Sequence, residues 1–110
     1  MRKALQKLTA EEFMDQVVSR ETNAVVEVGA AWSGSSQVVM STLTSVAQTQ
    51  STPLNLYHID SEVNPFIHKL YNIDTLPALL FFRKGILVDK LSGLTSRVSI
   101  SEKINQHFNT

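Results

Sequence analysis

Two serines separated by two residues stand where a reactive site is expected. Ser33 and Ser36 lie in the stretch AAWSGSSQVV, between an apolar run and a predicted helix that begins near Ser35. A helix N-terminus has unpaired N–H groups and the positive end of the helix dipole, so it stabilises anions. A serine hydroxyl nevertheless stays protonated at neutral pH unless a base is dedicated to it. The position is typical of a reactive site, but the side chains are not reactive by themselves.

A hydrolase built on either serine would need an adjacent base and a group that orients that base. The histidines of the chain are His58, His68 and His107. The predicted topology puts the first at a strand end and the other two on helices, away from the Ser33 loop. The sequence also has no G-x-S-x-G motif. We therefore expect no catalytic residue of this kind.

Acidic residues occupy two further positions of chemical interest. Glu27 lies within the apolar run 24–30, where an unpaired buried carboxylate would be costly. A carboxylate there needs a partner, such as a hydroxyl or a water beneath the following loop. His58, Asp60 and Glu62 alternate in the manner of metal ligands, but no fourth ligand accompanies them, so we interpret them as a polar strand exit.

The composition describes one small globular domain. The 110 residues are 43% hydrophobic and 18% charged, with a formal net charge of zero and no cysteine. The balanced charge argues against nucleic-acid binding, which needs a basic surface, and no apolar run approaches the about 20 residues that span a bilayer. Residues 1–13 lack the apolar core of a secretory signal. We expect a monomeric cytoplasmic protein without cofactor, metal, membrane or nucleic-acid partner.

The elements that must position these residues alternate between strands and helices. Thr9 with Glu12 forms a capping box for the first helix, and Ser99 with Glu102 predicts a second capping box for the last one. Strands are expected at 3–8, 24–30, 54–60, 78–83 and 86–91. Helices are expected at 10–19, 35–50, 65–71 and 100–108, the third of them capped by Asn64. The early strands should be parallel and the final hairpin antiparallel, which gives an α/β fold with helices on both faces of a mixed sheet.

The order of these elements and four short segments resemble the thioredoxin family over nearly the whole chain. The segment VVEVGAAWSGSS resembles the family's strand and active-site segment, in which an acidic residue precedes Trp-Cys-Gly-Pro-Cys. The segment YHIDSEVNP resembles the third strand and its exit. The segment NIDTLPALLFFRKGILVDKLSGL resembles the region with the active-site proline, the Lys-Gly turn and a later glycine. The resemblance implies a thioredoxin fold with a five-stranded sheet and four helices.

The resemblance also implies roles for individual positions. Glu27 falls on the buried acid that helps to move a proton for the deeper cysteine of the family. It is either a relic of that proton transfer or a structural group, and the lack of cysteine favours the second interpretation. Trp32 falls on the tryptophan beside the active site. Ser33 falls on the nucleophilic cysteine and Ser36 on the resolving cysteine. Pro77 falls on the proline that is cis in the family, which implies a cis peptide bond after Leu76. Gly93 falls on the glycine that lines the substrate groove. Together with Gly34 and Ser35, the residues Trp32, Leu76, Pro77 and Gly93 form the expected binding groove.

The departures from the family pattern decide the chemistry. Ser35 replaces a proline, Ser41 replaces the kinking proline of the long helix, and Leu56 is nearest to a missing lysine. Family chemistry proceeds by attack of a thiolate on a disulfide and resolution by a second thiol. A serine forms no sulfur–sulfur bond, so this chain as it stands carries out no dithiol exchange.

Three hypotheses follow from a retained groove without thiols. The first is a redox-inactive adaptor or chaperone-like module that binds a protein or an extended peptide by strand addition at Leu76. The second is a Cys-to-Ser form of a thiol–disulfide oxidoreductase that acts in cell redox homeostasis. The third is a glutathione- or anion-binding relative, in which Ser33 and Ser36 cradle the ligand.

Overall fold

The computed structural model describes residues 5–50 and 53–109 and follows the expected order of elements. The strands are β1 (Leu5–Lys7), β2 (Ala24–Gly29), β3 (Asn55–Asp60), β4 (Ala78–Arg83) and β5 (Ile86–Ser92). The helices are α1 (Ala10–Phe13), the π-helix η1 (Met14–Ser19), α2 (Gly34–Gln48), α3 (Phe66–Leu70) and α4 (Arg97–Phe108). Residues 3 and 4 of the first predicted strand lie outside the described residues. None of the described helices has the length and apolar character needed to cross a membrane.

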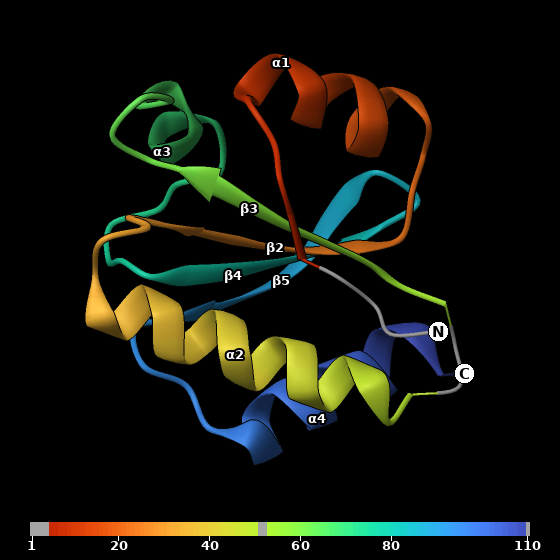
Figure 1. Cartoon of the computed structure of the whole chain (residues 1–110). Coiled ribbons are helices and arrows are strands. Elements are labelled where there is room, and N and C mark those ends of the chain that lie inside the picture. The colour runs from red at the N-terminus through yellow and green to blue at the C-terminus, as the bar shows by residue number, and fades with distance from the viewer. Residues whose placement is uncertain (1–4, 51–52, 110) are drawn as a thin grey trace.

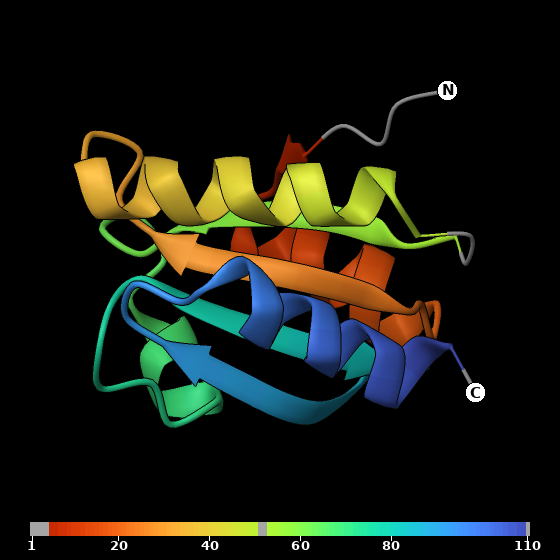
Figure 2. The ribbon, with the colours of Figure 1, turned by 90° about the horizontal axis from the view of Figure 1, so that it is seen from below.

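The sheet has the predicted mixture of parallel and antiparallel strands. Its order is β1-β3-β2-β4-β5, with β1, β3 and β2 parallel and β4 antiparallel to both of its neighbours. Helices α2 and α4 cover one face, and α1 and α3 cover the other (Figure 1). Figure 2, seen from the α2 and α4 side, shows these two helices running roughly along the strands in front of the sheet. The predicted fold class is confirmed.

Every residue of β2 is buried, as its largely apolar run predicts for a central strand. Alternate residues face opposite layers because successive side chains of a strand point to opposite faces. Val26 and Val28 join the core under α1 and α3, whereas Val25 joins the core under α2 and α4. Glu27 therefore points to the α2 side, where the first turn of that helix begins.

The first helix is capped as predicted, but its second part is a π-helix, which has a wider turn than an α-helix. Thr9 Oγ1 accepts from the Glu12 N–H at 3.1 Å, and Glu12 Oε1 accepts from the Thr9 N–H at 2.8 Å, so the capping box is confirmed. The predicted extent of 10–19 is also correct, but its second part is the π-helix η1. Hydrophobic spacing does not distinguish these two helix types over so short a segment.

The prediction for the start of the last helix was wrong. Helix α4 begins at Arg97, and its cap is Ser96, whose Oγ accepts from the Ser99 N–H at 3.1 Å. Ser99 is thus the third helical residue rather than the cap. Ser96 and Ser99, three residues apart, are both possible caps for this helix. Glu102, three residues after Ser99, favours Ser99 because it would complete a capping box. The earlier start lets Arg97 donate to Ser45 Oγ of α2 at 2.6 Å, a contact that local sequence does not encode.

The third helix is shorter than predicted and covers less of the sheet. It spans Phe66–Leu70, with Pro65 in the cap position, and only its Ile67 is buried. The sequence spacing of Phe66 and Leu70 is typical of core residues, but both are about half exposed, at 49% and 48%. A helix of five residues turns a single side chain fully onto the sheet. Asn64, expected as the cap, instead accepts from the Ala10 N–H through Oδ1 at 3.0 Å.

Helix α4 is tied to β5 through Asp89. Oδ2 of Asp89 lies 2.8 Å from Lys103 Nζ and 2.9 Å from His107 Nε2, and Oδ1 accepts from the Lys90 N–H at 2.9 Å. Partial burial raises the pKa of Asp89, but the hydrogen bonds from these groups outweigh that effect. The pKa of this carboxyl consequently lies below its usual value.

Candidate functional site

The loop from β2 to α2 is organised by Ser33. Its Oγ accepts from the Ser36 N–H at 3.5 Å, which makes Ser33 the N-cap of α2, and its carbonyl accepts from the Gln37 N–H at 3.1 Å. The Ser33 N–H donates to the Ala30 carbonyl at 2.9 Å. The helix begins at Gly34, one residue before the predicted start, and ends at Gln48 rather than residue 50. Ser33 therefore has a structural role as the N-cap of α2.

Glu27 joins Ser36 and His58 in a cluster that we term the buried polar trio. The hydroxyl of Ser36 donates to Oε2 of Glu27. Nδ1 of His58 lies 2.5 Å from Oε1 of the same carboxylate. The exposed fractions are 0% for Glu27, 1% for Ser36 and 3% for His58. The interpretation of Glu27 as a structural group bonded to a hydroxyl is thereby supported by a named partner.

The sheet register brings the trio together. Glu27 and His58 are register partners on the neighbouring parallel strands β2 and β3, so their side chains share a face. Ser36 approaches from the first turn of α2 above that face. Gly29 provides the room, because a Cβ at this position would collide with the Ser36 hydroxyl and with Oε2 of Glu27. The close approach therefore requires glycine at this end of β2.

The placement of His58 corrects one sequence-based expectation. The topology suggested that no histidine would reach the Ser33 loop, yet His58 is linked to Ser36 through Glu27. The alternation of side chains along β3 could have predicted this contact. Position 58 lies on the same face of the strand as Leu56, which is nearest to the position of the family's missing lysine. Nε2 of His58 is buried and has no hydrogen-bond partner within residues 5–50 and 53–109.

The trio is not a hydrolase triad. In such a triad the histidine contacts the nucleophile and the carboxylate orients the histidine. Here the carboxylate of Glu27 lies between the hydroxyl of Ser36 and the imidazole of His58. Ser36 is also almost completely buried, so its side chain presents little surface to a substrate. The geometry supports positioning of the α2 N-terminus rather than nucleophilic attack.

A pocket of about 190 Å³ opens beside the capped helix end. Its lining residues are Ala30, Trp32, Ser33, Ser36, Ser61, Glu62, Leu76 and Pro77. Trp32 is 74% exposed and Leu76 is 41% exposed, and the peptide bond between Leu76 and Pro77 is cis, as the resemblance implied. Nε1 of Trp32 donates to Oε1 of Glu62 at 3.0 Å. We refer to this as the tryptophan pocket.

The tryptophan pocket contains part of the predicted groove. Trp32, Leu76 and Pro77 line it, whereas Gly34, Ser35 and Gly93 do not. Gly93 is nonetheless adjacent, because its N–H donates to the Pro77 carbonyl at 2.7 Å. Gly93 has a φ of +74°, and a Cβ there would meet no atom within 4 Å. The lining residues Ala30, Ser61 and Glu62 were not predicted. Ser61 and Glu62 follow the end of β3, and only tertiary contacts bring that segment to the loop before α2.

The possible metal ligands at the end of β3 are directed to different partners. His58 contacts Glu27, and Glu62 accepts from Trp32. Asp60 accepts from the Glu62 N–H through Oδ1 at 2.9 Å. Across the described ranges, no three acidic or histidine side chains gather in a way that would hold a metal ion.

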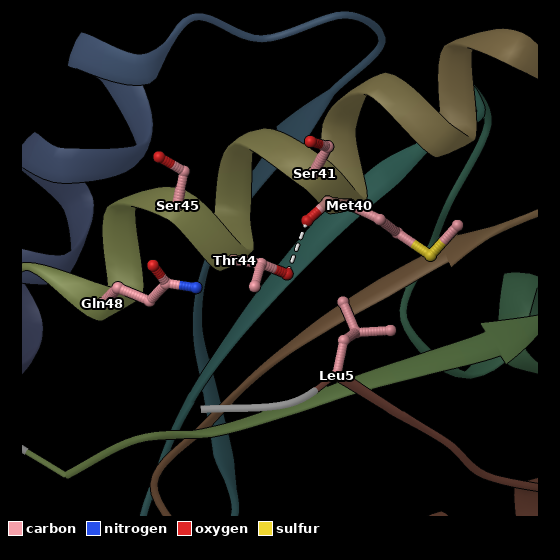
Figure 3. Close-up of a pocket in the computed structure, with 6 residues that line it drawn as sticks. All are labelled: Leu5, Met40, Ser41, Thr44, Ser45 and Gln48. Carbon is pink, nitrogen blue, oxygen red and sulfur yellow. Dashed lines mark hydrogen bonds between the residues drawn. The ribbon is translucent and has the colours of Figure 1, made fainter. Parts of the chain in front are cut away.

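A second hollow, of about 430 Å³, lies between α2 and β1 (Figure 3). It is lined by Leu5, Met40, Ser41, Thr44, Ser45 and Gln48. Thr44 Oγ1 donates to the Met40 carbonyl at 2.8 Å, so this hydroxyl is satisfied within the helix. No titratable side chain lines the hollow, and we assign no chemistry to it.

Comparison with known proteins identifies the family to which the chain belongs. The Thioredoxin family model matches residues 4–106, and the chain therefore belongs to the thioredoxin family. The chain is 23% identical over 105 residues to thioredoxin 1 of Nostoc sp., covering 96% of this chain and 98% of that protein. It is 28% identical over 98 residues to the chloroplastic thioredoxin Y1 of Arabidopsis thaliana, covering 89% of this chain and 57% of that protein.

Solved structures give the same fold. A mutant thioredoxin of Halobacterium salinarum superposes with a TM-score of 0.79 at 19% identity, covering 96% of this chain and 90% of the other. The thioredoxin of Malassezia sympodialis superposes with a TM-score of 0.79 at 20% identity, covering 96% and 92%. Within this family, the present chain is thioredoxin-like and has no cysteine.

Proposed function

We propose that this chain is a protein- or peptide-binding module that uses the thioredoxin groove and carries out no dithiol exchange. The observation that carries the proposal is the tryptophan pocket. There, two large apolar side chains that line a concave surface, Trp32 and Leu76, remain exposed. Exposed apolar side chains around a concavity are typical of recognition sites.

The backbone beside the pocket supports strand addition. Neither the N–H nor the carbonyl of Leu76 has a hydrogen-bond partner in the described part of the chain. An extended peptide placed alongside would pair with these groups, while its side chains enter the pocket. Main-chain pairing gives affinity in such complexes and the pocket gives specificity. This function needs no sulfur atom.

The fit of Ser36 supports serine as the functional residue at this position. Its hydroxyl donates to the buried carboxylate of Glu27. A cysteine thiol is a weak donor and would satisfy that carboxylate less well. This argues against the alternative in which the serines merely replace native cysteines of an oxidoreductase. The carboxylate directly beneath Ser36 also disfavours the alternative of an anion cradled by the two serines, because it is itself an anionic acceptor.

An NMR titration of the isotope-labelled chain with extended, cysteine-free peptides tests the proposal. Saturable shifts are expected at the amides of Trp32, Gly34, Leu76 and Gly93. Trp32→Ala should weaken binding at least about tenfold, because a central tryptophan dominates small interfaces. Ile86→Ala, which removes a similarly exposed apolar side chain from the hairpin, should bind as the parent does. Shifts elsewhere, or none across a broad peptide panel, would show that the groove is vestigial.

A further inference from the structure

The tryptophan pocket carries a charge that specifies its ligand. Glu62 is the one charged residue among those that line it, and no lysine, arginine or histidine does so. Oε1 of Glu62 accepts from the Trp32 indole, whereas Oε2 has no hydrogen-bond or ion-pair partner in the part of the chain that the structure describes. An unpaired carboxylate oxygen at the rim of an apolar pocket is complementary to a cation on the ligand.

The size of the pocket limits what enters it. A volume of about 190 Å³ lies below the roughly 300–1,000 Å³ of pockets that enclose small-molecule ligands. One long side chain of an extended peptide is the appropriate occupant. The apolar surfaces of Ala30, Leu76 and Pro77 suit the methylene stem of such a side chain, since long basic residues bury their stems and keep the charged head in water.

The hydrogen bond from Trp32 to Glu62 holds an aromatic ring and a carboxylate side by side. Its length of 3.0 Å fixes the ring edge against Oε1 of the carboxylate. Three-quarters of the Trp32 surface is exposed, so ring surface is open to a ligand. A planar guanidinium stacks on an aromatic face and donates to a carboxylate at the same time, which an ammonium does less well. The combination favours arginine over lysine.

We propose that the tryptophan pocket selects an extended segment carrying an arginine, with the guanidinium against Trp32 and Glu62. The proposal rests on the proposed binding function and specifies its ligand. Asp60, whose Oδ1 accepts from the Glu62 N–H, adds negative potential at the same strand exit. The expected partner is a protein with an unfolded, arginine-containing segment.

Calorimetry at low ionic strength, with three otherwise identical nine-residue peptides, tests this ligand. The central residue is arginine, the neutral isostere citrulline, or the apolar norleucine. The arginine peptide should bind about five- to tenfold more tightly than the citrulline peptide, as expected for one exposed ion pair with a cation–π contact. That advantage should shrink as salt is added.

Two variants assign the preference to its source. Glu62→Gln removes the charge but keeps an oxygen that accepts from the Trp32 indole, so the ring stays in place and the arginine advantage should disappear. Glu102→Gln makes the same change on α4, away from the pocket lining, and should keep it. Equal binding of all three peptides overturns the arginine preference but leaves the binding function standing. Binding of none overturns both.

Discussion

The clearest test of the site concerns the hydroxyl of Ser36. Ser36→Ala removes the donor to Oε2 of Glu27, and that carboxylate, with 0% of its surface exposed, has no access to water as a substitute. Loss of a hydrogen bond to a buried charged group costs about 1.5–3 kcal/mol. Alanine regains about 0.5 kcal/mol through its higher helix propensity. We therefore expect the free energy of unfolding to fall by about 2 kcal/mol.

Urea denaturation and thermal melting both measure this loss. For a domain of this size, a change of about 2 kcal/mol lowers the melting temperature by roughly 9 °C. It lowers the urea midpoint by about 1 M when the slope is near 2 kcal/mol per M. Ser41→Ala is the matched control, because Ser41 is exposed on the same helix. The control should change stability by no more than about 0.5 kcal/mol.

The outcome also bears on the interpretation of the trio. A double-mutant cycle between Ser36→Ala and Glu27→Gln should show a coupling energy of about 1 kcal/mol or more, because both changes remove the same bond. If Ser36→Ala unfolds at the same urea concentration as Ser41→Ala, the hydroxyl does not support the buried carboxylate. The reasoning about the serine at this position would then fail, and with it the argument against a native cysteine.

Two further changes probe other parts of the fold. Gly29→Ala places a Cβ against the Ser36 hydroxyl and should lower the free energy of unfolding by about 1–3 kcal/mol, as overpacking does. The largest changes in amide chemical shift are expected at the start of α2. Unchanged stability in urea would show that the surrounding side chains move aside at little cost. The lowered pKa of Asp89 means that its contacts with Lys103 and His107 stabilise the fold above the ordinary carboxyl pKa, and that this contribution is lost as the pH falls through the pKa of the folded state. Asp89→Asn should therefore be less stable than the parent at pH 7 and should lose less stability on acidification. Parallel curves of unfolding free energy against pH for the two proteins, from pH 6 to pH 2, would contradict this.

Local sequence patterns determined most of the architecture. The buried run of β2 and the capping box at Thr9 predict their elements because they depend on neighbouring residues alone. The same locality explains the errors. Ser96 and Ser99 are both adequate caps by local chemistry, and the contact of Arg97 with α2 is made only by the earlier start.

The sequence by itself determined that the chain has no cysteine thiol. The resemblance to the thioredoxin family predicted that Trp32, Leu76 and Pro77 lie together. Only the tertiary structure decided how the remaining polar groups are used. The bond from Ser36 to Glu27 spans nine residues, that from Glu27 to His58 spans 31, and that from Trp32 to Glu62 spans 30. Strand register and the placement of α2 set these contacts. Pairing across such separations depends on how the sheet assembles, which no local pattern encodes.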